Sequence, residues 1–519
     1  MEMININNIP ADKFKFAEKT DYQHDSKFDT KPVSYFQGAF RRFAKNKGAV
    51  VGGIVIIFLV LFAILAPLFT PYTPSYYDMM FAHNPPKIGL AEKLDLDFWD
   101  GYRVKEVGEL AYLKDLALMT ETGKEVIKNG EYTVTEAEDG SKIYTYRYNP
   151  QYGLGFGKYK IISLEEFQAI QEYQNETGRQ VIYPTVKFSD RPTQEKNKYD
   201  ANIYYKVENA KKATIKPKLT KEGEFTPNYW KYNADVKRSS LIPEYNSLRI
   251  EGENGFVDEN TGIRYLYAYG RRVDGGVEIR ADYYEYYIYE HTEVIKDGIK
   301  EPNFIFGTTD TGKDIFACLA YGARFSFMFA TIVAVCNFLV GVIWGSISGY
   351  FGGKVDLFME RFTEVLGAVP SMIVITLLKY HMGSSSQALV LFLSFFATGW
   401  IGMAHLTRMQ FYRFKNQEYV LAARTLGATD RRVMFKHVFP NGLGTIVTSC
   451  ALIIPTMIYS ETSLSYLGII NLEAGNTTSV GTLIAAGQSS IVANAGYVAL
   501  FPCLFLCLLM LSFNLFGNG

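Results

Sequence analysis

Residues 325–353 read FSFMFATIVAVCNFLVGVIWGSISGYFGG and contain no Asp, Glu, Lys or Arg. The hydrocarbon core of a membrane takes about 20 residues of helix to cross. An uncharged apolar run of this length therefore predicts a transmembrane helix. Similar apolar stretches predict five more spans, with Pro370 kinking the third and Pro455 lying inside the fifth. These stretches are residues 48–69, 362–378, 387–404, 442–460 and 497–516.

A polar, tyrosine-rich stretch, residues 70–303, separates the first span from the second. Its length is sufficient to bury a core of its own. Aromatic and polar residues alternate over residues 144–148, 264–269 and 283–289, which predicts strands, and residues 164–176 are predicted to form a helix. We therefore expect an all-α integral membrane protein with six transmembrane helices and an inserted, strand-rich α+β domain.

The distribution of basic residues predicts the orientation in the membrane. Four basic residues, Arg41, Arg42, Lys45 and Lys47, precede the first span. The segment between the fourth and fifth spans is also strongly basic. Because cytoplasmic segments carry an excess of Lys and Arg, both regions are expected in the cytoplasm. The prediction is a multi-pass plasma-membrane protein with a cytoplasmic tail, residues 1–47, and with residues 70–303 outside the cell.

The composition gives no sign of a metal site. The five cysteines all lie in the apolar C-terminal part, no pair of them has zinc-site spacing, and the six histidines are scattered. The formal net charge of zero is a sum over opposed regions and does not point to nucleic acid. We expect no metal ligands, no catalytic residues and no nucleic-acid partner.

The segment GTTDTGKD, residues 307–314, nearly matches a phosphate-binding loop. That loop needs Ser or Thr after its Lys, because the hydroxyl holds the magnesium ion. Here Asp314 follows Lys313, and its carboxylate would repel phosphates. The sequence therefore predicts no nucleotide site in this segment.

Residues 416–441 read NQEYVLAARTLGATDRRVMFKHVFPN and predict two helices joined at a glycine. Asn416 is a candidate N-cap, and Glu418 lies in the first turn, where the helix dipole favours a carboxylate. Gly427 fits the left-handed position that ends a helix. Thr429 or Asp430 can cap the second helix, whose end Pro440 marks. A basic amphipathic hairpin lying on anionic lipid is one interpretation of this segment.

The spacing of Glu418, Ala422, Ala423, Gly427 and Pro440 supports a second interpretation. It resembles the EAA loop of ABC importer permeases, by which a permease docks on its ATPase. Residues 306–519 as a whole resemble the C-type permease of oligopeptide and dipeptide ABC importers. The matching segments include residues 306–326, 349–356, 461–468 and 513–517.

The resemblance implies a permease domain of the type I importer kind over residues 304–519. It implies a second, B-type permease subunit, two cytoplasmic ATPase subunits that use ATP and magnesium, an extracellular substrate-binding lipoprotein and a peptide substrate. The chain itself would bind no cofactor and would not be an enzyme. The implied ATPase-docking residues are Glu418, Ala422, Ala423, Arg424, Gly427, Arg431 and Pro440.

Two residues near the end of the fifth span, Glu461 and Ser463, are candidates for the translocation path. The alternative for Glu461 is simple exposure at the membrane interface. Permeases for nickel or other solutes belong to the same family. A secondary transporter is a different class, which normally needs ionisable residues near mid-membrane, and the spans are nearly free of them. A membrane-anchored surface receptor would leave the basic loop without a role.

Overall fold

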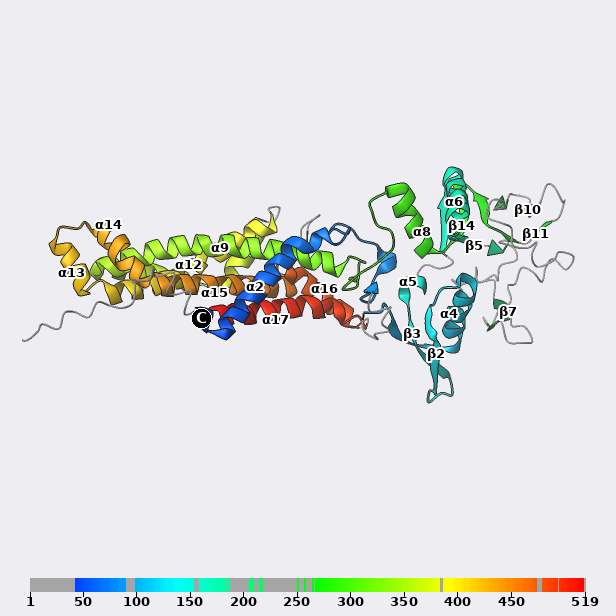
Figure 1. Cartoon of the computed structure of the whole chain (residues 1–519), viewed down its shortest axis with the longest axis horizontal. Coiled ribbons are helices and arrows are strands. Elements are labelled where there is room, and N and C mark those ends of the chain that lie inside the picture. Colours follow the sequence, from blue (N-terminus) through cyan, green and yellow to red (C-terminus); the bar gives the residue numbers. More distant parts are fainter. Residues whose placement is uncertain are drawn as a thin grey trace, which may run out of the picture.

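The computed structural model describes residues 43–89, 99–153, 158–183, 185–186, 205–209, 214–217, 250–251, 256–257, 264–265, 267–382, 386–473, 478–492 and 494–517. A long bundle of helices carries a domain of strands and helices at one end (Figure 1). We call this end of the bundle the domain end. The opposite end, called the tip end, carries α13 (Glu418–Thr425) and α14 (Asp430–Arg432).

Five helices of the described chain are long and apolar enough to cross a membrane, or six if one bent pair counts as a span. The bent pair, α10 (Gly353–Gly367) and α11 (Ser371–His381), meets at 70°, and Pro370 is the N-cap of α11. The kink predicted at this proline is therefore confirmed. The five are α2 (Lys47–Leu65) with η3 (Ala66–Leu68), α9 (Ile315–Phe351), α12 (Gln387–Phe414), the run of α14, η9 (Val433–Val438) and α15 (Phe439–Tyr466), and α17 (Tyr497–Gly517).

Helices α9 and α12 pack closely against each other. At three successive turns, the α9 residue that faces α12 is a glycine. A Cβ atom added at Gly341 would lie 2.6 Å from Met403 Cβ, and one at Gly345 would lie 2.2 Å from the Ala404 carbonyl oxygen. Gly349 lies one turn further along and is equally close to α12. Small residues spaced by four let two membrane helices approach closely, so this glycine stripe sets the distance between α9 and α12.

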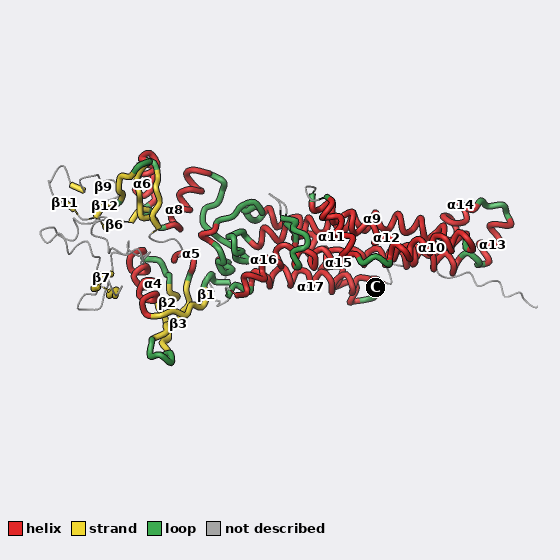
Figure 2. The backbone as a smooth tube through the Cα atoms, turned by 180° about the vertical axis from the view of Figure 1, so that it is seen from behind, coloured by secondary structure: helices red, strands yellow, loops and turns green. Residues whose placement is uncertain are grey.

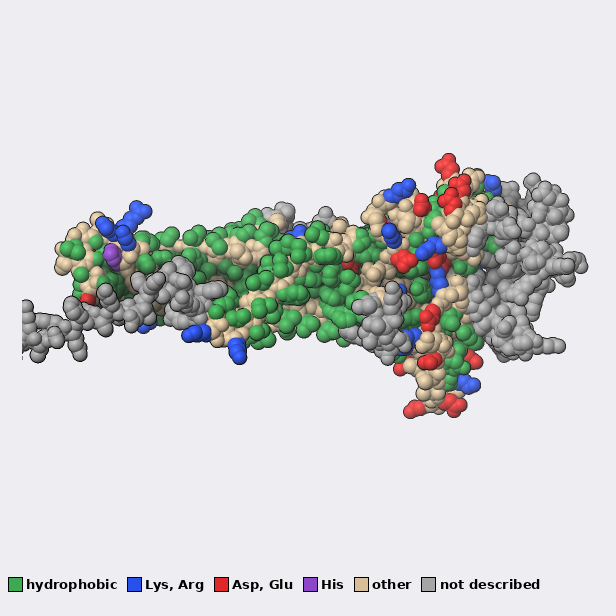
Figure 3. Space-filling view, in the orientation of Figure 1, with side chains coloured by type: hydrophobic (Ala, Val, Ile, Leu, Met, Phe, Trp, Pro, Cys, Tyr) green, Lys and Arg blue, Asp and Glu red, His purple; other side chains and the backbone are tan. Residues whose placement is uncertain are grey.

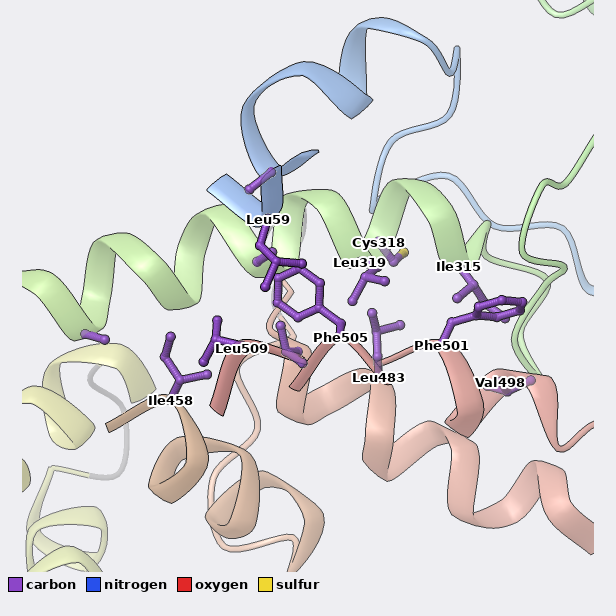
Figure 4. Packing of buried hydrophobic residues seen from close by; sticks show 14 of the residues in the cluster. Leu59, Ile315, Cys318, Leu319, Ile458, Leu483, Val498, Phe501, Phe505 and Leu509 are labelled. Carbon is purple, nitrogen blue, oxygen red and sulfur yellow. The ribbon is translucent and has the colours of Figure 1, made fainter. Parts of the chain in front are cut away.

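A large buried cluster joins helices from both ends of the sequence near the domain end (Figure 4). Leu59 of α2 meets Leu319 of α9 and Phe505 of α17 in this cluster, and Leu483 enters it from α16 (Val480–Val492). The helix α16 has 13 residues and is too short to span a membrane, and the sequence did not predict it. It fills the space between α15 and α17.

Among its described residues, the inserted domain contains a three-stranded and a five-stranded sheet, which lie beyond the domain end (Figure 2). The first is antiparallel with the order β1-β3-β2, formed by β1 (Arg103–Gly108), β2 (Ile127–Glu136) and β3 (Lys142–Tyr148). The strand predicted at residues 144–148 is thus confirmed. The helix α4 (Glu109–Thr122) covers one face, where the Tyr112 ring stacks on the Tyr144 ring at 4.4 Å.

The second sheet has the order β4-β14-β13-β9, with β5 pairing to β14, and α6 (Leu164–Thr177) confirms the helix predicted there. Of the strand predicted at residues 264–269, the structure has only two short pieces, β11 (Arg264–Tyr265) and β12 (Tyr267–Ala268). These two pieces do not belong to the second sheet. Its five strands are β4 (Lys158–Ile162), β5 (Ile182–Tyr183), β9 (Ile250–Glu251), β13 (Gly270–Val273) and β14 (Gly276–Ala281).

The strand predicted at residues 283–289 is wrong, because this segment forms the helix α8 (Tyr283–Tyr289). The Asp282 side chain caps it by accepting a hydrogen bond from the Tyr284 backbone N–H, and Glu285 lies in the first turn. Residues 284–289 are all buried, so α8 has no face exposed to solvent. The alternation of aromatic and polar residues therefore does not mark the half-buried strand that it suggests.

The domain is attached to the start of α9 through aromatic packing and a helix cap. Tyr287 of α8 packs against Phe81, and its hydroxyl accepts a 2.6 Å hydrogen bond from the Tyr76 hydroxyl. Asp314 is the N-cap of α9 and accepts hydrogen bonds from the Ala317 N–H at 3.0 Å and the Thr70 hydroxyl at 3.4 Å. Burial raises the pKa of Asp314 to about 7, so this cap takes up its proton near neutral pH.

Replacing Gly345 with Ala should destabilise the bundle by about 1–3 kcal/mol, because the added methyl group meets the α12 backbone. The matched control is Gly402→Ala on α12, where a Cβ atom would have nothing within 4 Å. The thermal midpoint of the purified chain, measured in one detergent, compares the two variants. Equal midpoints would contradict the close contact at Gly345.

Candidate functional site

The tip end is formed by the predicted pair of helices around Gly427. The helix α13 ends just before Gly427, whose φ of +80° lies in the left-handed region, so the predicted helix stop is confirmed. The N-cap of α13 is Gln417 rather than the predicted Asn416, and it makes no side-chain capping bond. Glu418 lies in the first turn as expected, and Thr429 is the N-cap of α14.

Tyr350, at the end of α9, fixes the tip to the bundle. Its hydroxyl donates a 2.5 Å hydrogen bond to Asp430 of α14, and the Arg424 guanidinium lies over its ring at 5.0 Å. A small apolar core supports these contacts. It consists of Tyr350, Phe411, Val420, Val433, Met434 and Val438. One aromatic side chain at the end of α9 therefore contacts both helices of the hairpin.

The outer surface of the tip is exposed and combines apolar with basic side chains. Leu426, next to the glycine turn, is 88% exposed. The predicted docking residues Glu418, Ala422, Arg424 and Arg431 are exposed there, and Ala423 is half-buried. Figure 3 shows Lys and Arg side chains gathered at this end of the molecule. Leu426 therefore lies exposed in the same segment as the charged side chains Glu418, Arg424 and Arg431.

Pro440 does not end the second helix, so that part of the prediction is wrong. Helix continues from Asp430 to Tyr466 through the π-helical turn η9, and Pro440 lies in the first turn of α15. Because a π-turn shifts the backbone hydrogen bonds by one residue, a helix can pass a proline that lacks an N–H donor. Pro440 is exposed but belongs to the base of the tip.

A polar network beneath the tip was missed as a functional element. Asp356 of α10 accepts two hydrogen bonds from Arg408 of α12, at 2.6 and 2.7 Å, and one from the Tyr412 hydroxyl at 2.6 Å. The Ser348 hydroxyl of α9 donates to the same carboxylate. The carboxylate therefore links three helices. The sequence signal was Asp356 itself, which follows the Gly-Tyr-Phe-Gly-Gly segment noted for its family resemblance.

The two translocation-path candidates lie far from the tip, near the other end of α15. Glu461 is 1% exposed, so the alternative of an exposed interface residue is wrong. Its carboxylate accepts hydrogen bonds from Ser479 at 2.6 Å, Ser465 at 3.1 Å and Ser326 at 3.3 Å. Ser463 is half-buried and donates to the Tyr459 carbonyl at 2.9 Å. Glu461 thus holds α15, α16 and α9 together inside the chain.

No group of three or more His, Cys, Asp or Glu side chains that could hold a metal ion is found among the described residues.

Removing the charge of Asp356 should destabilise the bundle, because Asp356→Asn leaves Arg408 without its two charge-assisted hydrogen bonds. A loss of about 1–3 kcal/mol is expected. The matched control on the same helix is Glu364→Gln, since the Glu364 pair with Arg361 is largely exposed and worth about 0–0.5 kcal/mol. Thermal unfolding of the purified variants measures the loss of stability in each. A larger loss in Glu364→Gln than in Asp356→Asn would contradict the prediction.

Two family models match this sequence. Residues 34–86 match the N-terminal TM domain of oligopeptide transport permease C, and residues 341–519 match the binding-protein-dependent transport system inner membrane component. The two matched stretches lie on either side of residues 87–340, which contain most of the inserted domain.

Curated relatives carry consistent names. The oligopeptide transport system permease protein OppC of Bacillus subtilis (strain 168) is 41% identical over 214 residues, which is 41% of this chain and 68% of the relative. The dipeptide transport system permease protein DppC of the same organism is 38% identical over 41% of this chain and 66% of that protein. The oligopeptide transport system permease protein OppC of Escherichia coli (strain K12) is 34% identical over 42% of this chain and 71% of that protein.

A solved structure titled as inward facing conformations of the MetNI methionine ABC transporter matches at a TM-score of 0.30 and 14% identity, over 37% of this chain and 90% of that chain. This likeness is too low to support a conclusion. The family models and the curated relatives do support one: this chain belongs to the family of binding-protein-dependent transport system inner membrane components, as a permease of the OppC and DppC kind.

Proposed function

We propose that this chain is the transmembrane permease subunit of an ATP-driven importer that moves oligopeptides or dipeptides into the cell. The names of its relatives support the peptide substrate. The tip carries the proposal, because Leu426 and the basic residues form an exposed surface that Tyr350 holds against the end of α9. A nickel or other solute permease of the same family is the alternative.

The partners in this proposal follow from the family. A second, B-type permease subunit completes the translocation path, and two ATPase subunits bind the tips of the two permeases. An extracellular lipoprotein delivers the peptide. When ATP draws the two ATPases together, each tip moves with its ATPase, and Tyr350 and the Asp356 network pass that movement to α9, α10 and α12.

The orientation is part of the proposal. The tip end carries most of the basic residues of the bundle and is placed in the cytoplasm, which puts the inserted domain outside the cell. The exposed turn at Gly140, between β2 and β3, and the turn at Gly427 lie at opposite ends of the molecule.

A protease recognition site inserted after Gly140 should be cut by protease added to intact cells. The same site inserted after Gly427 should be cut only after the cells are opened. Immunoblotting of the fragments gives the result. The reverse pattern would contradict the orientation.

The function is tested by reconstituting the chain with its co-purifying partners in proteoliposomes. Uptake of labelled di- and oligopeptides should require ATP, and the ATP must be supplied on the side of the vesicle membrane where the ATPase subunits lie. Nickel ions and labelled peptides are compared in the same preparation. Uptake of nickel without uptake of peptide would select the alternative, and uptake without ATP would reject the importer.

In this assay Gly427→Val should lower the amount of peptide taken up per ATP hydrolysed by several-fold. A β-branched residue resists the left-handed conformation at a cost of about 1–2 kcal/mol, and no neighbour lies within 4 Å of the added Cβ, so the effect comes from the backbone.

The control is Gly178→Val, which places the same substitution at the left-handed end of α6 in the inserted domain. It carries the same local strain far from the tip. If both variants keep the wild-type ratio of uptake to hydrolysis, Gly427 has no role in coupling.

A further inference from the structure

The segment GTTDTGKD, which resembles a phosphate-binding loop but lacks its Ser or Thr, forms a tightly held turn at the domain end. Within the turn, the Thr309 N–H donates to the Lys313 carbonyl at 3.0 Å. The Thr308 hydroxyl donates to the Phe81 carbonyl at 2.5 Å and accepts from the Asn84 N–H at 2.8 Å. A Cβ atom at Gly312 would lie 1.8 Å from the Asp78 carbonyl oxygen. The turn is therefore fixed in place before any ligand arrives.

A cavity of about 400 Å³ lies between this turn, the end of α15 and the start of α16. This volume is within the usual range for small-molecule sites. Hydroxyl groups are prominent in its wall, from Thr309, Thr311, Ser465, Thr478 and Thr482. Ser465 also donates to Glu461, so the cavity wall shares a residue with the buried carboxylate that joins α15 to α16.

The charges on the cavity wall leave one carboxylate uncompensated. Lys313 pairs with Glu473, and both residues line the cavity. Asp310 also lines it, is exposed, and forms no ion pair with another residue in the described part of the chain. With one lysine and two acids, the wall has a net charge of −1. Carboxylate and hydroxyl oxygens together suit a small cation that donates several hydrogen bonds.

We propose that this cavity is a subsite for the α-ammonium group of the incoming peptide, with Asp310 as its charged partner and the Thr311 and Thr478 hydroxyls as further acceptors. The hydroxyl oxygens of Thr309 and Thr482 already accept hydrogen bonds from backbone N–H groups of the chain. The proposal rests on the proposed function and deepens it, because it names the part of the substrate that is recognised. An ammonium group has three N–H donors and is common to every unmodified peptide. Recognition of this group is independent of side-chain identity.

The test uses the complete importer in proteoliposomes with its binding protein, and the probes are trialanine and N-acetyl-trialanine. The quantity measured is the ratio of their uptake rates. The same binding protein serves wild type and variants, so its own preference cancels when their ratios are compared. Asp310→Asn should reduce the preference for the free amine by roughly three- to fivefold, as for a partly exposed ion pair.

Two further variants separate this role from a merely structural one. Glu473→Gln releases Lys313 to offset the charge of Asp310, so it should also reduce the preference. Asp274→Asn makes the same isosteric change in the exposed turn between β13 and β14, and it should leave the ratio unchanged.

The outcomes are distinguishable. An unchanged ratio in both Asp310→Asn and Glu473→Gln, with uptake intact, overturns the subsite and leaves the importer function standing. A wild-type importer that takes up both probes equally also overturns it. If no peptide is taken up in any form, the proposed function fails as well. If Asp310→Asn does not fold, the Glu473→Gln result decides alone.

Discussion

The contact between α9 and α12 is the constraint on which the rest of the structure depends. Gly341, Gly345 and Gly349 bring the two backbones together without an intervening side chain over three turns of α9. In a membrane there is little hydrophobic gain in helix association, so close packing of this kind supplies the attraction. At one end of the contact, Asp356 closes it with a charge-assisted pair to Arg408. At the other end, the buried cluster around Leu319 and Phe505 adds α2 and α17.

The membrane part could be predicted well from the sequence, because an uncharged run of about 20 residues has few alternatives in water. The break at Pro370 and the turn at Gly427 were also predictable, since each follows from the allowed backbone angles of one residue. The helix α8 was not, because buried tyrosines on all its sides imitate the alternation of a strand. The residue that could have predicted this helix is Asp282, which caps its N-terminus. In a segment that is buried on every face, such a cap indicates the structure better than the alternation of aromatic and polar residues does.

Individual positions in the site were less predictable than the site as a whole. The sequence located the tip and its exposed residues, but it could not show that Tyr350 contacts both Arg424 and Asp430, since these residues are about 75 positions apart in the chain. Pro440 was misjudged because a π-turn, which has no clear sequence signature, lets the helix pass through it. Glu461 was placed at the correct end of its helix, but its hydrogen bonds come partly from Ser326 of α9 and from Ser479, which directly precedes α16.

The length of α9 has a mechanical consequence. It is one unbroken helix of 37 residues, about 55 Å long, with Tyr350 near one end and the Asp314 cap at the other. A stiff rod converts a small rotation at one end into a large displacement at the other, so tilting α9 by about 5° about the tip would move the Asp314 end by about 5 Å. The inserted domain is packed on that end through Phe81 and Tyr287. The inserted domain would therefore move together with the Asp314 end of α9, so that its displacement would follow the tilt of α9 within the bundle.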